Sequence, residues 1–152
     1  GVADKMPERL RHLVYFDALI LQPGEASAEL SPPGHFERYK REARPSPFGL
    51  MAYPREPEYF GITDTRQVEW LAARLTPQPI ALHEEKIALS NPVGNGVPVT
   101  YLACTSPYLA STARSRDFAK GRDGWTYLEM NAPHNAMMTH PEEFTEFLDG
   151  ID

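Results

Sequence analysis

Three segments of the chain consist mainly of apolar, β-favouring residues. They are residues 13–16 (LVYF), 99–104 (VTYLAC) and 125–130 (WTYLEM). Such runs are typical of strands that are covered on both faces, as in a parallel sheet. Asp17 stands at the end of the first run. The pattern therefore predicts three buried parallel strands and places a carboxylate at the end of one of them.

Helical patterns lie between and after these runs. A helix over residues 65–75 is predicted by an apolar stripe and by Asp64 and Gln67, which occupy the two positions of a capping box. The stripe consists of Val68, Leu71, Ala72 and Leu75. The polar segment 111–120 is expected to be helical as well. Strands that alternate with helices indicate an α/β fold.

The last helix is expected to start at Thr139-His140-Pro141-Glu142. Proline is favoured at the first helical position, and Glu142 stands where a capping box needs it. The buried stripe of this helix consists of Phe144, Phe147, Leu148 and Ile151.

Residues 23–57 differ from the rest of the chain in composition. Seven prolines (23, 32, 33, 45, 47, 54 and 57) exclude long regular elements, apart from one short helix near residues 35–43. Six aromatic residues punctuate this region and its end: Phe36, Tyr39, Phe48, Tyr53, Tyr59 and Phe60. Long excursions in compact domains are usually functional or disordered. Two interpretations stay open, a lid over an active site and an irregular surface loop.

Composition narrows the classes of function. The chain has 152 residues, 41% of them hydrophobic, which is enough for a packed core. Its net charge is −6, and no stripe of Lys and Arg indicates nucleic-acid binding. The apolar runs are too short to span a membrane, no signal segment opens the chain, and Cys104 is the single cysteine. These features favour a cytoplasmic protein.

Four stretches, in this order, carry a resemblance to a known family. They are residues 1–18, residues 60–79, residues 101–105, and residues 124–141 with Pro133-His134-Asn135-Ala136. Together they resemble bacterial α/β-hydrolases of the esterase group that is similar to plant methyl esterases and hydroxynitrile lyases. The resemblance implies the C-terminal part of that fold, with strands six to eight of a mostly parallel sheet, flanking helices and a lid segment.

This resemblance divides the chain into three parts. Residues 1–22 would hold the end of the helix that follows the nucleophile and the sixth strand. Residues 23–80 would form the lid excursion and its return helix. Residues 81–152 would form the C-terminal core with the seventh and eighth strands, the histidine loop and the final helix.

The family's nucleophile is a serine in Gly-x-Ser-x-Gly, which exposes its hydroxyl on a strained turn beside an oxyanion hole. No serine of this chain has that pattern. The resemblance therefore implies that the nucleophile lies on an N-terminal part of the same hydrolase, which would be the partner of this chain. The chain alone is expected to be inactive.

His134 is the first candidate catalytic residue. It follows a predicted strand and precedes a predicted helix, where a loop can present an imidazole to a serine. The resemblance implies that it takes the serine proton and returns it to the leaving group. A surface or capping histidine is the alternative. His140 is interpreted as a helix-start residue, and His12, His35 and His83 as ordinary.

Asp17 is the second candidate, as the acid that orients His134. Plant members carry the acid after the seventh strand, but residues 105–108 hold no carboxylate. The end of the sixth strand is the other place that this fold uses. The alternative is a structural carboxylate that binds backbone N–H groups. Asp117 and Asp123 lie in polar segments and are poorer candidates, and Cys104 is expected to be a buried strand residue.

The function expected from these residues is serine-dependent cleavage of a small, mostly apolar ester or amide. A hydroxynitrile-lyase-like C–C lyase and a non-catalytic ligand-binding member of the fold are the alternatives. No metal or cofactor is expected, since there is no His-x-x-x-His pair, no cysteine pair and no phosphate-binding loop, and residues 91–96 form a turn-rich connection. A homodimer is compatible with the sequence.

Overall fold

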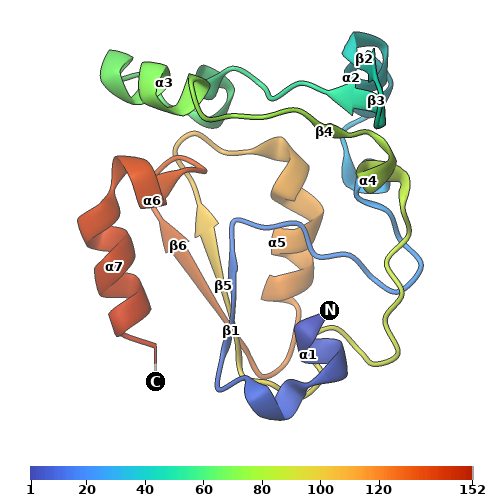
Figure 1. The fold of residues 1–152 in the computed structure, drawn as a ribbon. Coiled ribbons are helices and arrows are strands. Elements are labelled where there is room, and N and C mark those ends of the chain that lie inside the picture. The colour runs from blue at the N-terminus through green and yellow to red at the C-terminus, as the bar shows by residue number, and fades with distance from the viewer. Residues whose placement is uncertain (152) are drawn as a thin grey trace.

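A parallel sheet of three strands forms the core. The computed structural model describes residues 1–151 and orders these strands β1–β5–β6 (Figure 1). The strands span Leu13–Phe16 (β1), Val99–Cys104 (β5) and Trp125–Met130 (β6). Tyr15 pairs with Tyr101, which pairs with Tyr127. The three predicted strands and their parallel direction are confirmed.

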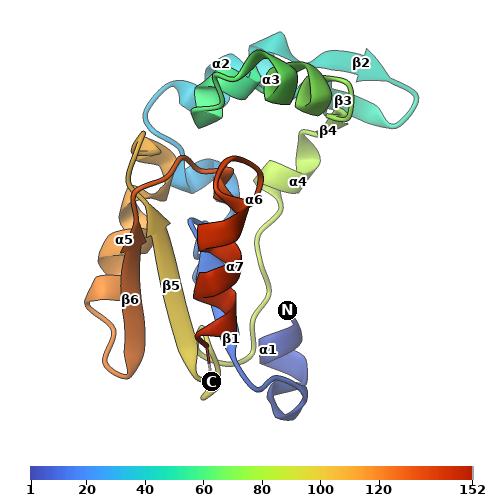
Figure 2. The same cartoon turned by 90° about the vertical axis from the view of Figure 1, so that its left-hand side faces the viewer.

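Two helices cover opposite faces of this sheet (Figures 1 and 2). On one face, Tyr101 and Ala103 belong to a core cluster with residues of α5 (Ala113–Lys120). On the other, Leu102 and Cys104 belong to a cluster that includes residues of α7 (Pro141–Asp149). Because successive strand residues point to opposite faces, β5 contributes to both clusters.

Complete burial of all three strands was expected, and this expectation is wrong for the two outer strands. Every residue of β5 is buried, whereas no residue of β1 is fully buried, and β6 buries only Met130 and leaves Leu128 43% exposed. The reason is position, because β1 and β6 each pair only with β5 among the described residues and form the edges of the sheet. Edge strands are covered less fully than central ones.

Residues 23–80 lie over the carboxyl ends of the sheet strands (Figure 1). A small antiparallel sheet of β2 (Arg44–Ser46), β3 (Gly49–Ala52) and β4 (Gln78–Pro79) orders this segment. Its helices are α2 (His35–Glu42), α3 (Thr65–Ala72) and the 3-10 turns η2 (Ser27–Leu30) and η3 (Pro57–Phe60). The short helix near 35–43 is confirmed, but the small sheet was not predicted. The proposed boundaries at residues 22 and 80 stay a prediction.

The other elements are short connections. They are α1 (Val2–Lys5), η1 (Pro7–Arg9), α4 (Ala81–Glu84), η4 (Ala110–Thr112) and α6 (Ala136–Thr139). Within residues 1–151, no helix combines the length and the apolar character needed to cross a membrane.

The predicted helix caps are partly correct. Asp64 accepts a hydrogen bond of 3.0 Å from the Gln67 backbone N–H, as expected. The Gln67 side chain does not complete the box, because it donates to the Met138 carbonyl at 3.3 Å and so links α3 to α6. The box at Thr139 is wrong. Thr139 is the last residue of α6, so it cannot take the extended backbone of an N-cap, and His140 occupies that place.

Candidate active site

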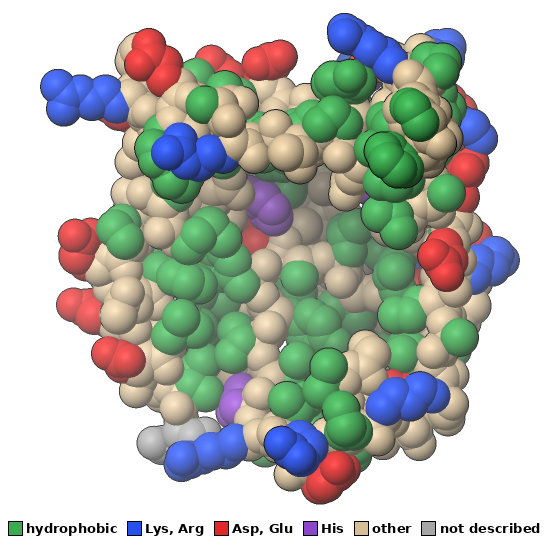
Figure 3. All heavy atoms as spheres, viewed as in Figure 1, with side chains coloured by type: hydrophobic (Ala, Val, Ile, Leu, Met, Phe, Trp, Pro, Cys, Tyr) green, Lys and Arg blue, Asp and Glu red, His purple; other side chains and the backbone are tan. Residues whose placement is uncertain are grey.

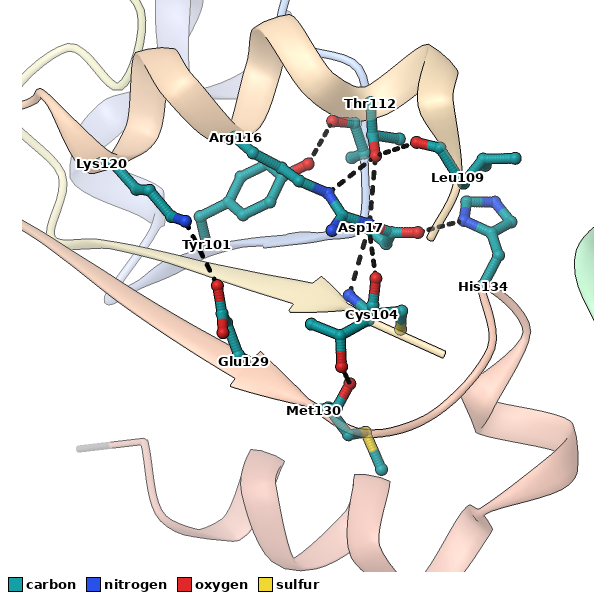
Figure 4. Close-up of polar contacts among 12 residues, drawn as sticks. Asp17, Tyr101, Cys104, Leu109, Thr112, Arg116, Lys120, Glu129, Met130 and His134 are labelled. Carbon is teal, nitrogen blue, oxygen red and sulfur yellow. Dashed lines mark hydrogen bonds and ion pairs between the residues drawn. The ribbon is translucent and has the colours of Figure 1, made fainter. Parts of the chain in front are cut away.

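Asp17 and His134 meet at the carboxyl ends of the strands, although 117 residues separate them. Asp17 directly follows β1, and His134 lies in the loop between β6 and α6. Oδ2 of Asp17 is 2.8 Å from Nδ1 of His134 (Figure 4). The Asp17 side chain is fully buried, and that of His134 is 28% exposed. The structure brings both predicted site residues within hydrogen-bond reach, and their catalytic roles stay a prediction.

The backbone at Asp17 turns the carboxylate toward this position. Its φ is 40°, in the left-handed region that side chains other than glycine rarely adopt. Aspartate tolerates this region better than most residues. Its N–H donates to the Leu102 carbonyl at 2.7 Å, which fixes the turn against β5. Strained backbone of this kind is concentrated at functional sites.

The second oxygen of Asp17 is held by three donors. Oδ1 accepts from Arg116 Nη2 at 2.6 Å, from the Cys104 N–H at 3.3 Å and from the Thr112 hydroxyl at 3.4 Å. Arg116 enters from α5 on the side away from His134 (Figure 4). It is 4% exposed. The carboxylate is therefore fixed on both oxygens.

Opposing influences set the charge of Asp17. Burial raises the pKa of its carboxyl, but the hydrogen bond from His134 and the positive charge of Arg116 outweigh burial and hold the pKa below its usual range. The group is therefore ionised at neutral pH. An ionised carboxylate only accepts hydrogen bonds, so His134 Nδ1 carries the hydrogen and Nε2 is the free acceptor. Within residues 1–151, Nε2 has no hydrogen-bond partner.

Phe60 of η3 covers the imidazole. Its ring stacks on His134 with centroids 5.6 Å apart and planes inclined by 28°. The next residue, Gly61, has φ 80°, and a Cβ there would lie 2.5 Å from Pro107 and 2.8 Å from Pro133. Only glycine permits this approach to the loops after β5 and β6. The 23–80 segment is thus packed directly against the histidine loop.

A cavity of about 380 Å³ is lined mainly by residues of this segment, with Leu19, His83 and Ser111 from outside it. Figure 3 shows the molecule hollowed beneath the 23–80 segment, with hydrophobic side chains on the walls. Much of the lining is aromatic or aliphatic, from Leu19, Phe36, Tyr39, Tyr59, Phe60 and Leu75. Phe60 therefore forms a wall of the cavity and also contacts His134.

Two histidines line this cavity, His35 and His83, and both were interpreted as ordinary from the sequence. Nδ1 of His83 is 3.2 Å from Ser27 Oγ, and Nε2 is 2.9 Å from Gln78 Nε2. Burial lowers the pKa of His83, which keeps the ring neutral at neutral pH. With the Gln78 amide donating to Nε2, Nδ1 carries the hydrogen and donates to Ser27. A serine that accepts from the imidazole is not activated by it, so this pair lacks the arrangement of a nucleophile and its base.

The remaining candidates are placed as follows. Cys104 is fully buried, and burial together with the Asp17 charge raises its thiol pKa to about 12, so it is not a thiolate nucleophile. Asp117 and Asp123 are exposed, and neither is a hydrogen-bond partner of Asp17 or His134. His12 binds the Thr100 hydroxyl at 2.9 Å. Among residues 1–151, no group of three His, Cys, Asp or Glu side chains could hold a metal ion.

Arg116 is the residue of the site that the sequence did not reveal. It lies in a segment interpreted as polar, one of 15 Lys and Arg residues, and nothing local distinguishes it. The signal that existed was indirect. A buried aspartate at a strand end needs a counter-charge, but the sequence does not say which cation supplies it.

Comparisons of the sequence and of the structure with known proteins point to the same class of protein. No family model matches the chain. The carbendazim hydrolyzing esterase of Nocardioides sp. (strain SG-4G) is 27% identical over 159 residues, which is 97% of this chain and 64% of that protein. An extracellular α/β-hydrolase from a Paenibacillus species, described as sharing structural and functional homology with tobacco salicylic acid binding protein 2, matches with a TM-score of 0.75 and 18% identity, over 97% of this chain and 64% of that one.

A mutant of polyneuridine aldehyde esterase matches with a TM-score of 0.66 and 15% identity, over 98% of this chain and 65% of that one. The chain therefore has the α/β-hydrolase fold. Its structural neighbours include esterases of the plant type, as the resemblance implied. The chain spans about 64% of the length of the Nocardioides and Paenibacillus proteins.

Proposed function

We propose that this chain is the C-terminal part of a serine-dependent α/β-hydrolase that cleaves a small, mostly apolar ester or amide. In this proposal β1, β5 and β6 are the sixth, seventh and eighth strands. The nucleophilic serine, in Gly-x-Ser-x-Gly, and the oxyanion hole are supplied by the N-terminal part of the same hydrolase. The chain alone is then inactive.

The observation that carries the proposal is the hydrogen bond between Asp17 and His134. An ionised carboxylate on Nδ1 leaves Nε2 free to accept the serine proton as the serine oxygen attacks the carbonyl carbon. Nε2 then returns the proton to the leaving alcohol or amine, and an acyl-enzyme remains. Water then attacks the acyl-enzyme, with Nε2 taking its proton and returning it to the serine oxygen, and the carboxylic acid product is released. Asp17 stabilises the imidazolium that forms in each step.

The cavity supports the substrate class. Its volume of about 380 Å³ lies within the range of small-molecule sites, roughly 300–1,000 Å³. His134 does not line the cavity, but Phe60 both lines it and stacks on His134, so the cavity lies next to the imidazole. In this proposal a bound ester lies under the 23–80 segment, which acts as a lid. The chain's similarity to the carbendazim hydrolyzing esterase also favours ester cleavage.

The sheet supports a partner on the other side of β1. Within residues 1–151, β1 pairs only with β5, which leaves its second edge without a neighbouring strand. Exposed parallel edges are rare in native folds, because they template association with other strands. An N-terminal part that adds strands there would complete the sheet. A cytoplasmic location remains part of the proposal.

The experiment is active-site labelling of the complete protein with a fluorophosphonate probe, which reacts with activated serines. The expected result is loss of 4-nitrophenyl acetate hydrolysis, with the label on a peptide outside residues 1–152 that contains Gly-x-Ser-x-Gly. A folded protein that neither hydrolyses the ester nor takes up the label would contradict the proposal. That outcome would favour the ligand-binding alternative, and cyanohydrin cleavage without ester turnover would favour the lyase.

A further inference from the structure

The carboxylate of Asp17 lies in a setting that opposes its charge. Its side chain has no exposed surface, and the isolated charge of a buried carboxylate is costly enough that such groups usually take up a proton. A protonated Asp17 would orient His134 poorly and could not stabilise an imidazolium. The site therefore needs a neighbouring group that keeps this carboxylate ionised.

Arg116 is the one cation that faces Asp17 within residues 1–151, apart from His134 when that ring is protonated. The other titratable groups there are Cys104 and Tyr101 of β5, and burial with the Asp17 charge raises the pKa of both, so they are neutral at neutral pH. Asp17 and Arg116 form an ion pair at 2.6 Å with side chains 0% and 5% exposed. Such a pair is little screened by solvent.

The guanidinium is itself fixed from several directions. Nε donates to the Thr112 hydroxyl at 2.9 Å, and Nη2 also donates to the Cys104 carbonyl at 2.5 Å. The ring of Tyr108 lies 4.4 Å from its central carbon. Arginine suits this place because its planar fork satisfies several acceptors in fixed directions, which an ammonium does not.

We propose that Arg116 is a positioning residue that holds Oδ1 of Asp17 and keeps the carboxylate ionised, so that Oδ2 stays directed at His134 over a wide pH range. The inference rests on the proposed hydrolase function. Arg116 is buried and contacts Asp17 on the side away from His134, so it acts through Asp17 and not on the substrate. Oδ1 binds Arg116 and Oδ2 binds His134, and this arrangement of the two oxygens assigns the role.

Charge and geometry make separable contributions. Without the arginine charge, Asp17 would protonate at higher pH. This moves the acid limb of the pH profile of kcat/KM upward. A replacement that keeps the positive charge but loses the planar guanidinium would leave the acid limb in place. It would lower kcat, because the carboxylate would be held less firmly.

The test compares pH profiles of 4-nitrophenyl acetate hydrolysis in the complete protein. Arg116→Met should move the acid limb of kcat/KM upward by about one pH unit or more, within the range of 1–3 units known for an aspartate beside an arginine. KM should stay within about twofold. Arg116→Lys should keep the limb at the parent position and lower kcat. Arg114→Met is the control, since Arg114 is on the same helix with a side chain 55% exposed.

A purely structural role predicts something else. Activity of both Arg116 variants would then fall at every pH in proportion to the folded fraction, with the limb unmoved, and this result would overturn the proposal. Should Arg116→Met not fold, Arg116→Gln carries the same expectation, because it keeps hydrogen-bond donors and removes the charge.

A second readout does not depend on turnover. In protein labelled with ¹³C at the aspartate carboxyl carbons, the Asp17 resonance should titrate below the ordinary aspartate range in the parent and above it in Arg116→Met. An unmoved midpoint in a protein that hydrolyses esters would refute the role of Arg116 alone. A moved midpoint in a protein without esterase activity would refute the hydrolase function and leave the charge-holding role of Arg116 standing.

Discussion

Oδ2 of Asp17, at the end of β1, lies 2.8 Å from Nδ1 of His134, in the loop that follows β6. β5 separates these two strands, and its last residue, Cys104, donates its N–H to the other oxygen of the same carboxylate. The contact thus depends on the correct assembly of all three strands. It also fixes which imidazole nitrogen is free, and most of the functional predictions follow from that.

Asp17→Asn should lower kcat of the complete enzyme by about 10⁴, because an amide favours the wrong imidazole tautomer. It should also lower the free energy of unfolding by roughly 3–5 kcal/mol, since Arg116 loses its buried counter-charge. Urea unfolding and turnover measured on one sample separate the two effects. A fall in activity that only follows the folded fraction would mean that Asp17 is structural.

Stability should depend on pH through the same residue. The pKa of Asp17 is lowered in the folded state, so its contribution is fully present above the unfolded-state value of about 3.9 and is lost as pH falls through the folded-state pKa. The difference in free energy of unfolding between the parent and Asp17→Asn should therefore shrink below about pH 4. Urea titrations at a series of pH values measure it, and a constant difference down to pH 2 would contradict the assignment.

The sheet was predictable because its strands carry a local signal. The runs at 13–16, 99–104 and 125–130 are apolar and β-favouring, and all three became strands. β2 and β4 contain Pro45 and Pro79, which argue against strands locally, and their pairing with β3 is decided by tertiary contacts. The small sheet was missed for that reason.

The candidate site was predictable to a similar extent. Asp17 and His134 stand at strand ends and match a known order of elements, whereas Arg116 becomes visible only when α5 packs on the sheet.

Phe60→Ala should lower kcat/KM about tenfold or more. The ring stacks on His134 and forms a wall of the cavity, so its loss admits water and frees the imidazole. Phe48→Ala is the matched control, because Phe48 is 83% exposed in the turn between β2 and β3 of the same segment. Steady-state kinetics on both variants test this, and equal effects of the two would show that contact with His134 is irrelevant.

Cys104 should resist alkylation in the folded protein. Burial and the nearby Asp17 charge raise the pKa of its thiol to about 12, so hardly any thiolate exists at pH 8 and none is accessible. Mass spectrometry after iodoacetamide treatment should find the thiol unmodified in native protein and modified in urea, with esterase activity unchanged. Rapid alkylation of the native enzyme with loss of activity would instead show that Cys104 is a reactive group.

The central claim is that His134 is the general base, and kcat/KM of His134→Ala in the complete protein tests it most directly. The account predicts a loss of several orders of magnitude in ester hydrolysis by a protein that still folds, because the serine hydroxyl would have no group to take its proton. His140→Ala, a residue at the start of α7, should stay close to the parent. Activity of folded His134→Ala within tenfold of the parent would contradict the account.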